Sequence, residues 1–551
     1  MSLLSTARAA FLFTVIASSA LAAQVPHNTV FLGGAIYTEN VKQPWASALV
    51  IADGRIAYVG DDKGTRHYVT KTSRVVRLHG WMMLPGFHDA HAHPMSASLR
   101  FLRCQLGDKS TKETLFTAIR ACATAHADAA WLVGYEFPSK AFEKQPLSRA
   151  ELDTLVPDRP AYIANETGFG AWVNSRALAA AGIDPNSNPT GYISNDALNR
   201  VHALIPRATE AEYRAALKLW TDKANALGIT SVFDAATSPP MVEAYHAADL
   251  ANELKLRIVA AQLVDPKRGP EQVDEMIARR DSTRGQRFRA DAAKIFLDGE
   301  IDQHTAALLA PYADKPDTKG ELFVQPAALN PLVKRLDAAN FMIHMHVMGD
   351  AAIRAGLDAL EAAIRANGAG ERRNQLAHVA FAHPDDIPRF GALQVGANFS
   401  PGWFRADDPV LADTETALGP QRAQWLYPIA MVAEHTGPII MSSDWPATSM
   451  NPLEGIEVAV THQAPGGIGP VNRPEQRISL ELALRAYTLN AAWGAREDYI
   501  DGSLEKGKVA DLVVLDRNLF KIPASKIHET KVMLTLLDGE SVYRNPVLKF
   551  N

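Results

Sequence analysis

The two ends of the chain carry the hydrophobic pattern of short β-strands. Near the amino end, ALVIADGRIAYVG contains two apolar runs that meet at Asp53-Gly54, a dipeptide that favours a two-residue hairpin. Near the carboxyl end, VMLTLLDGESVYRN repeats this arrangement around Asp538-Gly539. We therefore expect one small β-sandwich domain formed by both chain ends, from residues 24–85 and 495–551. Two unrelated β appendages would give the same pattern.

The middle of the chain alternates helical and strand-like segments. Examples are EAEYRAALKLWTDKANALG followed by ITSVFDAA, and ALNPLVKRLDAAN followed by FMIHMHVMGD. Alternation over roughly 400 residues predicts an α/β architecture, and the length fits a (β/α)8 TIM-like barrel. We place this barrel at residues 86–494, with an insertion around 95–225. Chemistry in such barrels lies at the C-terminal ends of the strands, so polar residues at the ends of apolar runs are the candidates.

Composition and the first residues bear on location and partners. A hydrophobic content of 47% and a net charge of -5 are ordinary for a globular protein and give no reason to expect nucleic acid as a partner. Arg8, the apolar run after it and Ala20-Leu21-Ala22 have the form of a secretory signal peptide, placed at residues 1–23. A membrane anchor is the alternative, but the run is short for a span. We expect a secreted or periplasmic protein without a stable membrane anchor.

The chain has two cysteines, Cys104 and Cys122. An exported location permits a disulfide between them. A helix start at residues 110–113 places Cys122 on a helix, and a bridge to the strand-like segment at Cys104 is feasible. Two free buried thiols are the alternative. Neither cysteine has the spacing of a zinc site.

The stretch LPGFHDAHAHP brings three histidines close together. His91 and His93 are two residues apart, so on a strand both imidazoles lie on one face and can bind one divalent metal. Asp89 shares that face and could orient a ligand histidine. His88 points to the other face, and its role stays open. Taken alone, an H-x-H pair is a weak sign of a metal site.

Other apolar runs end in further candidate residues. Each has an ordinary structural alternative: a strand histidine can be a core residue, Asp444 can cap a helix, and Lys294 can pair with a carboxylate such as Asp298. Chance explains each residue singly better than it explains the whole set. The set runs in the order H-x-H, Lys, His, His and Asp, and each member lies near a predicted strand end. The candidates in these runs are Lys294, His344, His346, His378, His383 and Asp444.

These motifs resemble the amidohydrolase superfamily, specifically its YtcJ-like (amidohydrolase-3) branch, which includes N-substituted formamide deformylases. LPGFHDAHAHP resembles PGF-x-D-x-H-x-H, HVMGDAA resembles H-x-x-GD-x-A, and SSDWPATSMNPLEGI resembles GSD-x-P…NPL. The segments KIFLDGEIDQHTAALLAPY, NQLAHVAFAHPDDIPRF and GSLEKGKVADLVVLD extend the match over essentially the whole mature chain.

The resemblance implies a metal-dependent hydrolase that acts on carbon–nitrogen bonds other than peptide bonds, in an amide or N-acyl compound. Zinc-bound water would supply hydroxide, because zinc lowers its pKa to about 7. Lys294, if carboxylated, would bridge two metals, and Asp444 would also be the catalytic acid/base that carries a proton to the leaving nitrogen. Gly349-Asp350 fixes the register that selects His346 over His344. The implied ligands of one or two zinc ions are His91, His93, Lys294, His346, His378 and Asp444.

The sequence departs from the family pattern in two places. In the insertion that would cover the barrel mouth, Phe169 stands at a histidine position and Asn195 at a glutamate position. In the lysine segment, Glu300 and His304 replace the common serine and arginine. We take Phe169, Glu300, His304 and Trp403 as candidates for contacts with a small-molecule substrate. The loss of polar groups in the insertion favours a more apolar substrate, and neutral drift would explain it equally.

Two other functions stay open. No residue separates amide hydrolysis from hydrolysis of a lactone or other ester, or from deamination of a ring. A non-catalytic ligand-binding protein on the same scaffold is an alternative of another class, but the intact ligand set argues against it. The sequence leaves the oligomeric state open and is compatible with a homo-oligomer.

Overall fold

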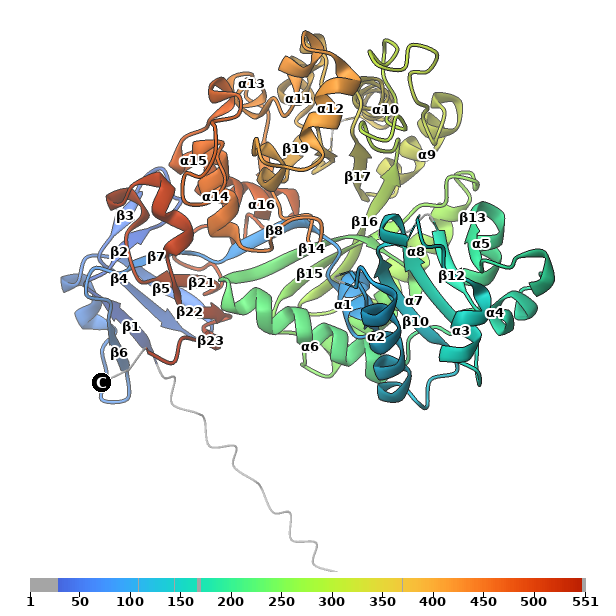
Figure 1. The fold of residues 1–551 in the computed structure, drawn as a ribbon. Coiled ribbons are helices and arrows are strands. Elements are labelled where there is room, and N and C mark those ends of the chain that lie inside the picture. Colours follow the sequence, from blue (N-terminus) through green and yellow to red (C-terminus); the bar gives the residue numbers. More distant parts are fainter. Residues whose placement is uncertain (1–27, 108, 143, 166–169, 369, 548–551) are drawn as a thin grey trace, which may run out of the picture.

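The computed structural model describes residues 28–547 except 108, 143, 166–169 and 369. The expected signal peptide and Phe169 lie outside these residues. Figure 1 shows the strands of both chain ends packed together at the left, the barrel strands at the centre and the insertion at the right. Within the described part of the chain, every helix is too short or too polar to cross a membrane.

An eight-stranded parallel sheet forms the centre of the molecule, in the order β20-β19-β18-β17-β16-β15-β14-β8. Two main-chain hydrogen bonds join its ends: Asp444 N donates to His91 O, and His93 N donates to Trp445 O, both at 2.8 Å. The sheet is therefore nearly closed into a barrel, and the predicted TIM-like fold is confirmed. The strands are β8 (Phe87–Ala92), β14 (Ile229–Thr237), β15 (Arg257–Leu263), β16 (Phe288–Phe296), β17 (Met342–Val347), β18 (Gln375–His378), β19 (Gly396–Phe399) and β20 (Ile439–Met441).

Helices connect the barrel strands and cover them. In α6, Thr209 and Glu212 form a capping box at the start, and Leu217, Trp220 and Ala224 are buried. The helices of this layer are α6 (Glu210–Ala226), α7 (Pro239–Leu250), α8 (Gln272–Ser282), α9 (Pro326–Ala338), α10 (Asp350–Asn367), α11 (Ile387–Leu393), α12 (Leu411–Leu418), α13 (Ile429–Glu434), α14 (Pro452–Thr461), α15 (Leu480–Ala486) and α16 (Leu489–Gly494).

Both chain ends contribute to a pair of sheets with a shared apolar core. Phe31 and Leu49 from the first sheet and Met83, Leu512 and Leu534 from the second lie in one buried cluster. The first sheet, in the order β5-β4-β1-β6, contains β1 (Thr29–Leu32), β4 (Ala48–Ala52), β5 (Arg55–Gly60) and β6 (Arg74–Arg77). The second, in the order β23-β22-β21-β7-β2-β3, contains β2 (Ala35–Tyr37), β3 (Trp45–Ala46), β7 (Met82–Pro85), β21 (Leu512–Leu515), β22 (Val532–Leu537) and β23 (Glu540–Arg544).

Both hairpins expected from the sequence are present. Asp53 and Gly54 connect β4 to β5 with φ angles of 51° and 75°, and Asp538 and Gly539 connect β22 to β23 with 50° and 76°. Positive φ at both central residues is the condition for the type I′ turn, which matches the twist of paired strands.

The insertion between β8 and α6 forms a smaller α/β unit. A disulfide joins Cys104 in β9 to Cys122 in α2, with the two Cα atoms 5.8 Å apart. Its sheet, in the order β13-β12-β11-β10-β9, contains β9 (Cys104–Gln105), β10 (Leu132–Phe137), β11 (Ala161–Asn165), β12 (Gly170–Val173) and β13 (Tyr192–Ser194). Its helices are α2 (Lys112–Ala125), α3 (Arg149–Leu155), α4 (Ser175–Ala180) and α5 (Asn195–His202), and α1 (Pro94–Phe101) leads into it from the barrel.

His88 lies outside the barrel interior, on the face of β8 opposite to His91. Its Nε2 contacts Asp501 Oδ2 at 2.9 Å, and its Nδ1 lies 3.8 Å from Glu497 Oε2. Burial alone lowers the pKa of His88, but the two carboxylates outweigh it and raise the pKa, while the pKa of Asp501 is lowered. His88 therefore forms a buried ion pair that ties β8 to the segment after α16.

Replacing His88 with glutamine should destabilise the protein by about 3 kcal/mol at pH 6, because it leaves Asp501 buried without its cation. A raised histidine pKa adds stability that is fully present below about pH 6.5 and is lost as the pH rises through the folded-state pKa. The difference in unfolding temperature between parent and His88→Gln should therefore narrow from pH 6 to pH 10. The exposed His435→Gln change should have little effect at either pH, and an undiminished His88 difference would contradict the ion pair.

Candidate metal centre

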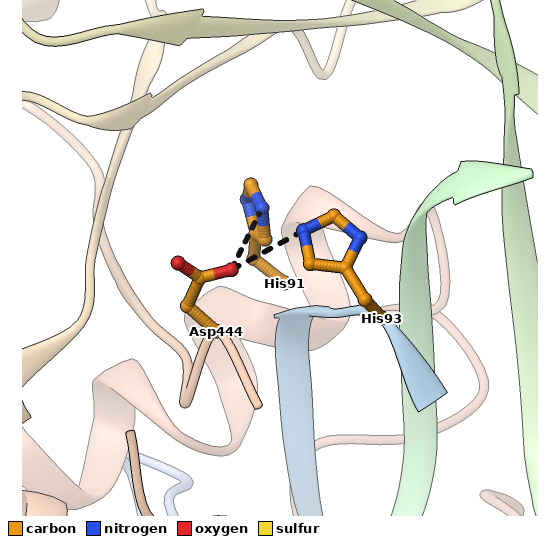
Figure 2. A group of neighbouring side chains, drawn as sticks. All are labelled: His91, His93 and Asp444. Atoms are coloured by element: carbon orange, nitrogen blue, oxygen red, sulfur yellow. Dashed lines mark ion pairs between the residues drawn. The ribbon is translucent and has the colours of Figure 1, made fainter. Parts of the chain in front are cut away.

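Three side chains meet at the C-terminal end of the barrel. His91 is in β8, His93 follows β8 and begins α1, and Asp444 follows β20. Asp444 Oδ1 lies 3.4 Å from His91 Nε2 and 3.3 Å from His93 Nε2, and the three potential ligand atoms lie within 4.8 Å of one another. Figure 2 shows both imidazoles turned toward the same carboxylate oxygen. This is a donor set suited to a divalent metal.

Asp89 holds the segment that carries Asp444. Its carboxylate accepts hydrogen bonds from the backbone N and the Oγ of Ser443. Ser443 lies across the seam that closes the barrel, and the backbone of His91 also hydrogen-bonds to Asp89. The role of Asp89 in orienting a ligand histidine stays a prediction. Asp444 itself has a φ of 51°, a left-handed conformation that is found preferentially at functional sites.

A second pair of histidines lies beside the first group. The rings of His346 in β17 and His378 at the end of β18 are 4.5 Å apart, and the His378 ring is 4.8 Å from that of His91. His378 Nδ1 is 4.0 Å from Asp444 Oδ2. The structure therefore brings His346 and His378, as well as His91 and His93, to one end of the barrel.

Lys294 is fully buried in β16. It pairs in register with His344 of β17, and its Nζ lies 4.6 Å from the centre of the Phe296 ring. Burial lowers the pKa of Lys294 to about 7, although the Asp444 carboxylate opposes the change. Among the described residues, Nζ has no hydrogen-bond partner, so the alternative pairing with Asp298 is not made. Asp298 instead accepts hydrogen bonds from the backbone N of Ala307, Met348 and Gly349.

The electrostatics of the cluster suit a metal. Burial lowers the pKa of His346 to about 3 and that of His91 and His378 well below the usual value, and Lys294 adds to each effect. The imidazoles are therefore neutral, which is the form that binds metals. Several of their buried nitrogens lack a hydrogen-bond partner within the described chain, a costly arrangement that ligation would relieve. These atoms are His91 Nε2, His346 Nε2 and His378 Nδ1. The residues present thus fit a divalent cation held by imidazole and carboxylate.

His344 is a site residue that the sequence analysis set aside. Its Nε2 lies 2.8 Å from His91 Nδ1, and its ring stacks on Phe233 at 4.8 Å. If His91 Nε2 held a metal, Nδ1 would carry the proton and would donate a hydrogen bond to His344 Nε2. The sequence signal was present in FMIHMHVMGD, since His344 shares a strand face with His346. Only the barrel geometry shows which histidine it contacts.

The substrate-pocket candidates divide into two groups. The Trp403 ring is 5.3 Å from that of His378, and Glu300 Oε1 is 4.0 Å from His346 Nε2, so both border the cluster. Burial and the carboxylates of Asp302 and Asp444 raise the pKa of Glu300 to about 7. His304 instead contacts Asp314, with its Nε2 3.0 Å from Oδ1, and has no contact with the metal-site residues among those described. His383 likewise faces Trp425 and Asp385.

A parallel barrel that gathers histidines and an aspartate at the C-terminal ends of its strands has the architecture of a metal-dependent hydrolase. The model of the amidohydrolase family matches residues 74–543, and the chain belongs to that family. The family and the hydrolase class expected from the motifs are thereby confirmed.

Two relatives agree with this assignment, and one solved structure shares the fold. The chain is 25% identical over 540 residues to the Bacillus subtilis (strain 168) protein named YtcJ, with 93% of this chain and 99% of that one covered. It is 25% identical over 532 residues to an N-substituted formamide deformylase of Arthrobacter pascens, covering 92% and 96%. An uncharacterized metal-dependent hydrolase from Pyrococcus furiosus superposes with a TM-score of 0.75 at 24% identity, covering 90% and 100%, which shows the shared fold.

Replacing His344 with leucine should weaken metal binding about 10- to 100-fold, because His91 loses the partner that holds its ring and tautomer. His344→Gln keeps a side-chain acceptor and should recover part of the loss. Competition with a chelator of known affinity measures both effects. Equal metal affinity in the leucine variant and the parent would show that His344 does not position His91.

Proposed function

We propose that this protein is an exported zinc-dependent hydrolase that cleaves the C–N bond of a small amide or N-acyl compound. The observation that carries this proposal is the convergence of His91, His93 and Asp444 at the barrel mouth. Beside them, buried nitrogens of the site histidines have no hydrogen-bond partner among the described residues. The similarity to a formamide deformylase supports the choice of bond. The apolar run with a small-x-small site at residues 1–23 supports export.

The metal-holding roles follow from the donors. His91, His93 and Asp444 would hold one zinc ion, and His346 and His378 a second. Imidazole nitrogen and carboxylate oxygen are the ligands that zinc favours. When bound, zinc lowers the pKa of a water ligand and polarises a substrate carbonyl.

Lys294 would complete the site after carboxylation. A buried amine without a partner is costly, and its burial favours the neutral form that reacts with carbon dioxide. In this step Nζ bonds to the carbon of carbon dioxide and releases one proton, which gives a carbamate. The product would offer anionic oxygen ligands in place of the neutral amine, near His91 and His346.

Asp444 would move the proton during hydrolysis. Its carboxylate accepts a proton from the attacking water and returns it to the leaving nitrogen. This transfer matters because an amide nitrogen leaves poorly unless it is protonated. The hydrogen bonds from Ser443 to Asp89, and from Asp444 N to His91 O, hold the carboxylate in place.

Metal content tests the ligand assignment. Purified mature protein should contain about two zinc ions per chain, and Lys294→Ala should lose at least one of them, because the bridging ligand is gone. Lys334→Ala, which removes an exposed lysine of α9, should retain the parent content. One metal in both Lys294→Ala and the parent would remove Lys294 from the site. No metal in either after reconstitution would leave a binding protein as the better explanation.

Asp444→Asn should reduce kcat on N-formyl and N-acyl amines by about 10²- to 10⁴-fold, because the proton shuttle is lost. The exposed Asp358→Asn change on α10 should leave kcat unchanged. Metal content measured in parallel separates a lost ligand from a lost proton carrier. A parent enzyme that hydrolyses esters or lactones but none of the amides would overturn the assignment of the bond.

A further inference from the structure

A polar cavity of about 260 Å³ lies at the opposite end of the barrel from the metal centre. It is bordered by Arg289, near the start of β16, and by Asn340, just before β17. Arg289 and Lys294 belong to the same strand, so the cavity is roughly 16 Å from the metal site at 3.3 Å per residue. The two sites are therefore separate. Four arginines line the cavity: Arg280, Arg284, Arg289 and Arg496.

Two of these arginines are neutralised by carboxylates. Arg280 Nε lies 2.8 Å from Asp281 Oδ1, and an Arg289 guanidinium nitrogen lies 2.8 Å from Asp291 Oδ2. Arg289 also lies 3.5 Å from Glu497 Oε1. Both carboxylates that line the cavity, Asp281 and Asp291, are therefore already paired with an arginine.

The other two have no carboxylate partner within the described chain. Arg496 donates only to the O and Oδ1 of Asn340 and to the backbone O of Glu371. Arg284 is exposed and makes no side-chain hydrogen bond or ion pair in the same part of the chain. The cavity wall therefore carries two positive charges in excess.

The neighbouring charges disfavour the charged form of Arg496. Burial lowers the pKa of Arg496, and the positive charges of Arg289 and Arg373 lower it further, against the opposing effect of Asp291. Like charges held together in a partly buried pocket destabilise the protein unless an anion lies among them.

We propose that this cavity binds a small oxyanion of the phosphate type. Planar guanidinium groups match phosphate oxygens with paired hydrogen bonds, and the cavity volume admits a single phosphate group. The Asp291 carboxylate lines the cavity, and its side chain is partly exposed there, at 19%. Hydrogenphosphate carries an O–H that satisfies this acceptor and sulfate does not, so the site prefers phosphate. This proposal does not rest on the proposed hydrolase function.

Thermal unfolding and calorimetric titration of the full mature protein test the site. At low ionic strength, inorganic phosphate should raise the unfolding temperature more than sulfate at equal ionic strength. Arg284→Gln should weaken phosphate binding about tenfold. In phosphate-free buffer the same variant should unfold at a higher temperature than the parent, because it removes an uncompensated charge. Titration with methyl phosphate, which presents the same group, distinguishes the two sources. Tighter binding of inorganic phosphate identifies free phosphate as the ligand, and tighter binding of methyl phosphate identifies a phosphomonoester.

Arg365→Gln is the matched control, because Arg365 is an exposed arginine on α10 that pairs with Glu361. This variant should keep the full phosphate response. Phosphate can also bind metal ions, so the comparison of the two arginine variants decides the outcome rather than the rise in unfolding temperature alone. An unchanged response in Arg284→Gln, or an equal rise with sulfate, would mean an adventitious ion only and would overturn the proposal.

Discussion

The seam between the first and last strands of the barrel is the contact on which the metal centre depends. Two main-chain hydrogen bonds cross it, from Asp444 N to His91 O and from His93 N to Trp445 O. Asp89 crosses the same seam to Ser443. These bonds bring side chains together that are far apart in the sequence. The centre therefore exists only when the barrel is closed, and whatever loosens the seam separates its ligands.

The barrel interior shields the ligand nitrogens from water, which would otherwise form hydrogen bonds with them. His346 and His378 are buried, and their free nitrogens face neighbouring side chains rather than solvent. Holding neutral imidazoles and an amine in this way is unfavourable for the isolated protein. The large apolar cluster of the barrel compensates for it, with β-strands and helices packed on every side. The site is thus arranged before a ligand arrives.

Local patterns in the sequence predicted those features that depend on neighbouring residues. The two Asp-Gly hairpins follow from turn chemistry, and the common face of His91 and His93 follows from strand periodicity. The motif order placed Lys294 and Asp444 at strand ends. Contacts across the barrel were beyond such reasoning, because the pairing of His344 with His91 depends on strands that are not neighbours in the sheet.

Other contacts that the sequence did not predict also join segments that are far apart in the chain. Asp89 shares a strand face with the ligand histidines, which made them its expected partners, and barrel closure adds Ser443 as a partner from the far side of the seam. The arginine cavity combines the loop after α8, the start of β16 and the segment after α16. The periodicity of a single segment does not predict that arginines from separate segments line one cavity.

The paired sheets at the chain ends also constrain the order in which the molecule is completed. β7 lies between β2 and β21 in its sheet, and β21 comes from near the carboxyl terminus. During translation β21 leaves the ribosome roughly 400 residues after β7, a delay on the order of half a minute. Until then one edge of β7 lacks its hydrogen-bonded neighbour, and open strand edges promote aggregation. The domain whose synthesis starts first is thus completed last.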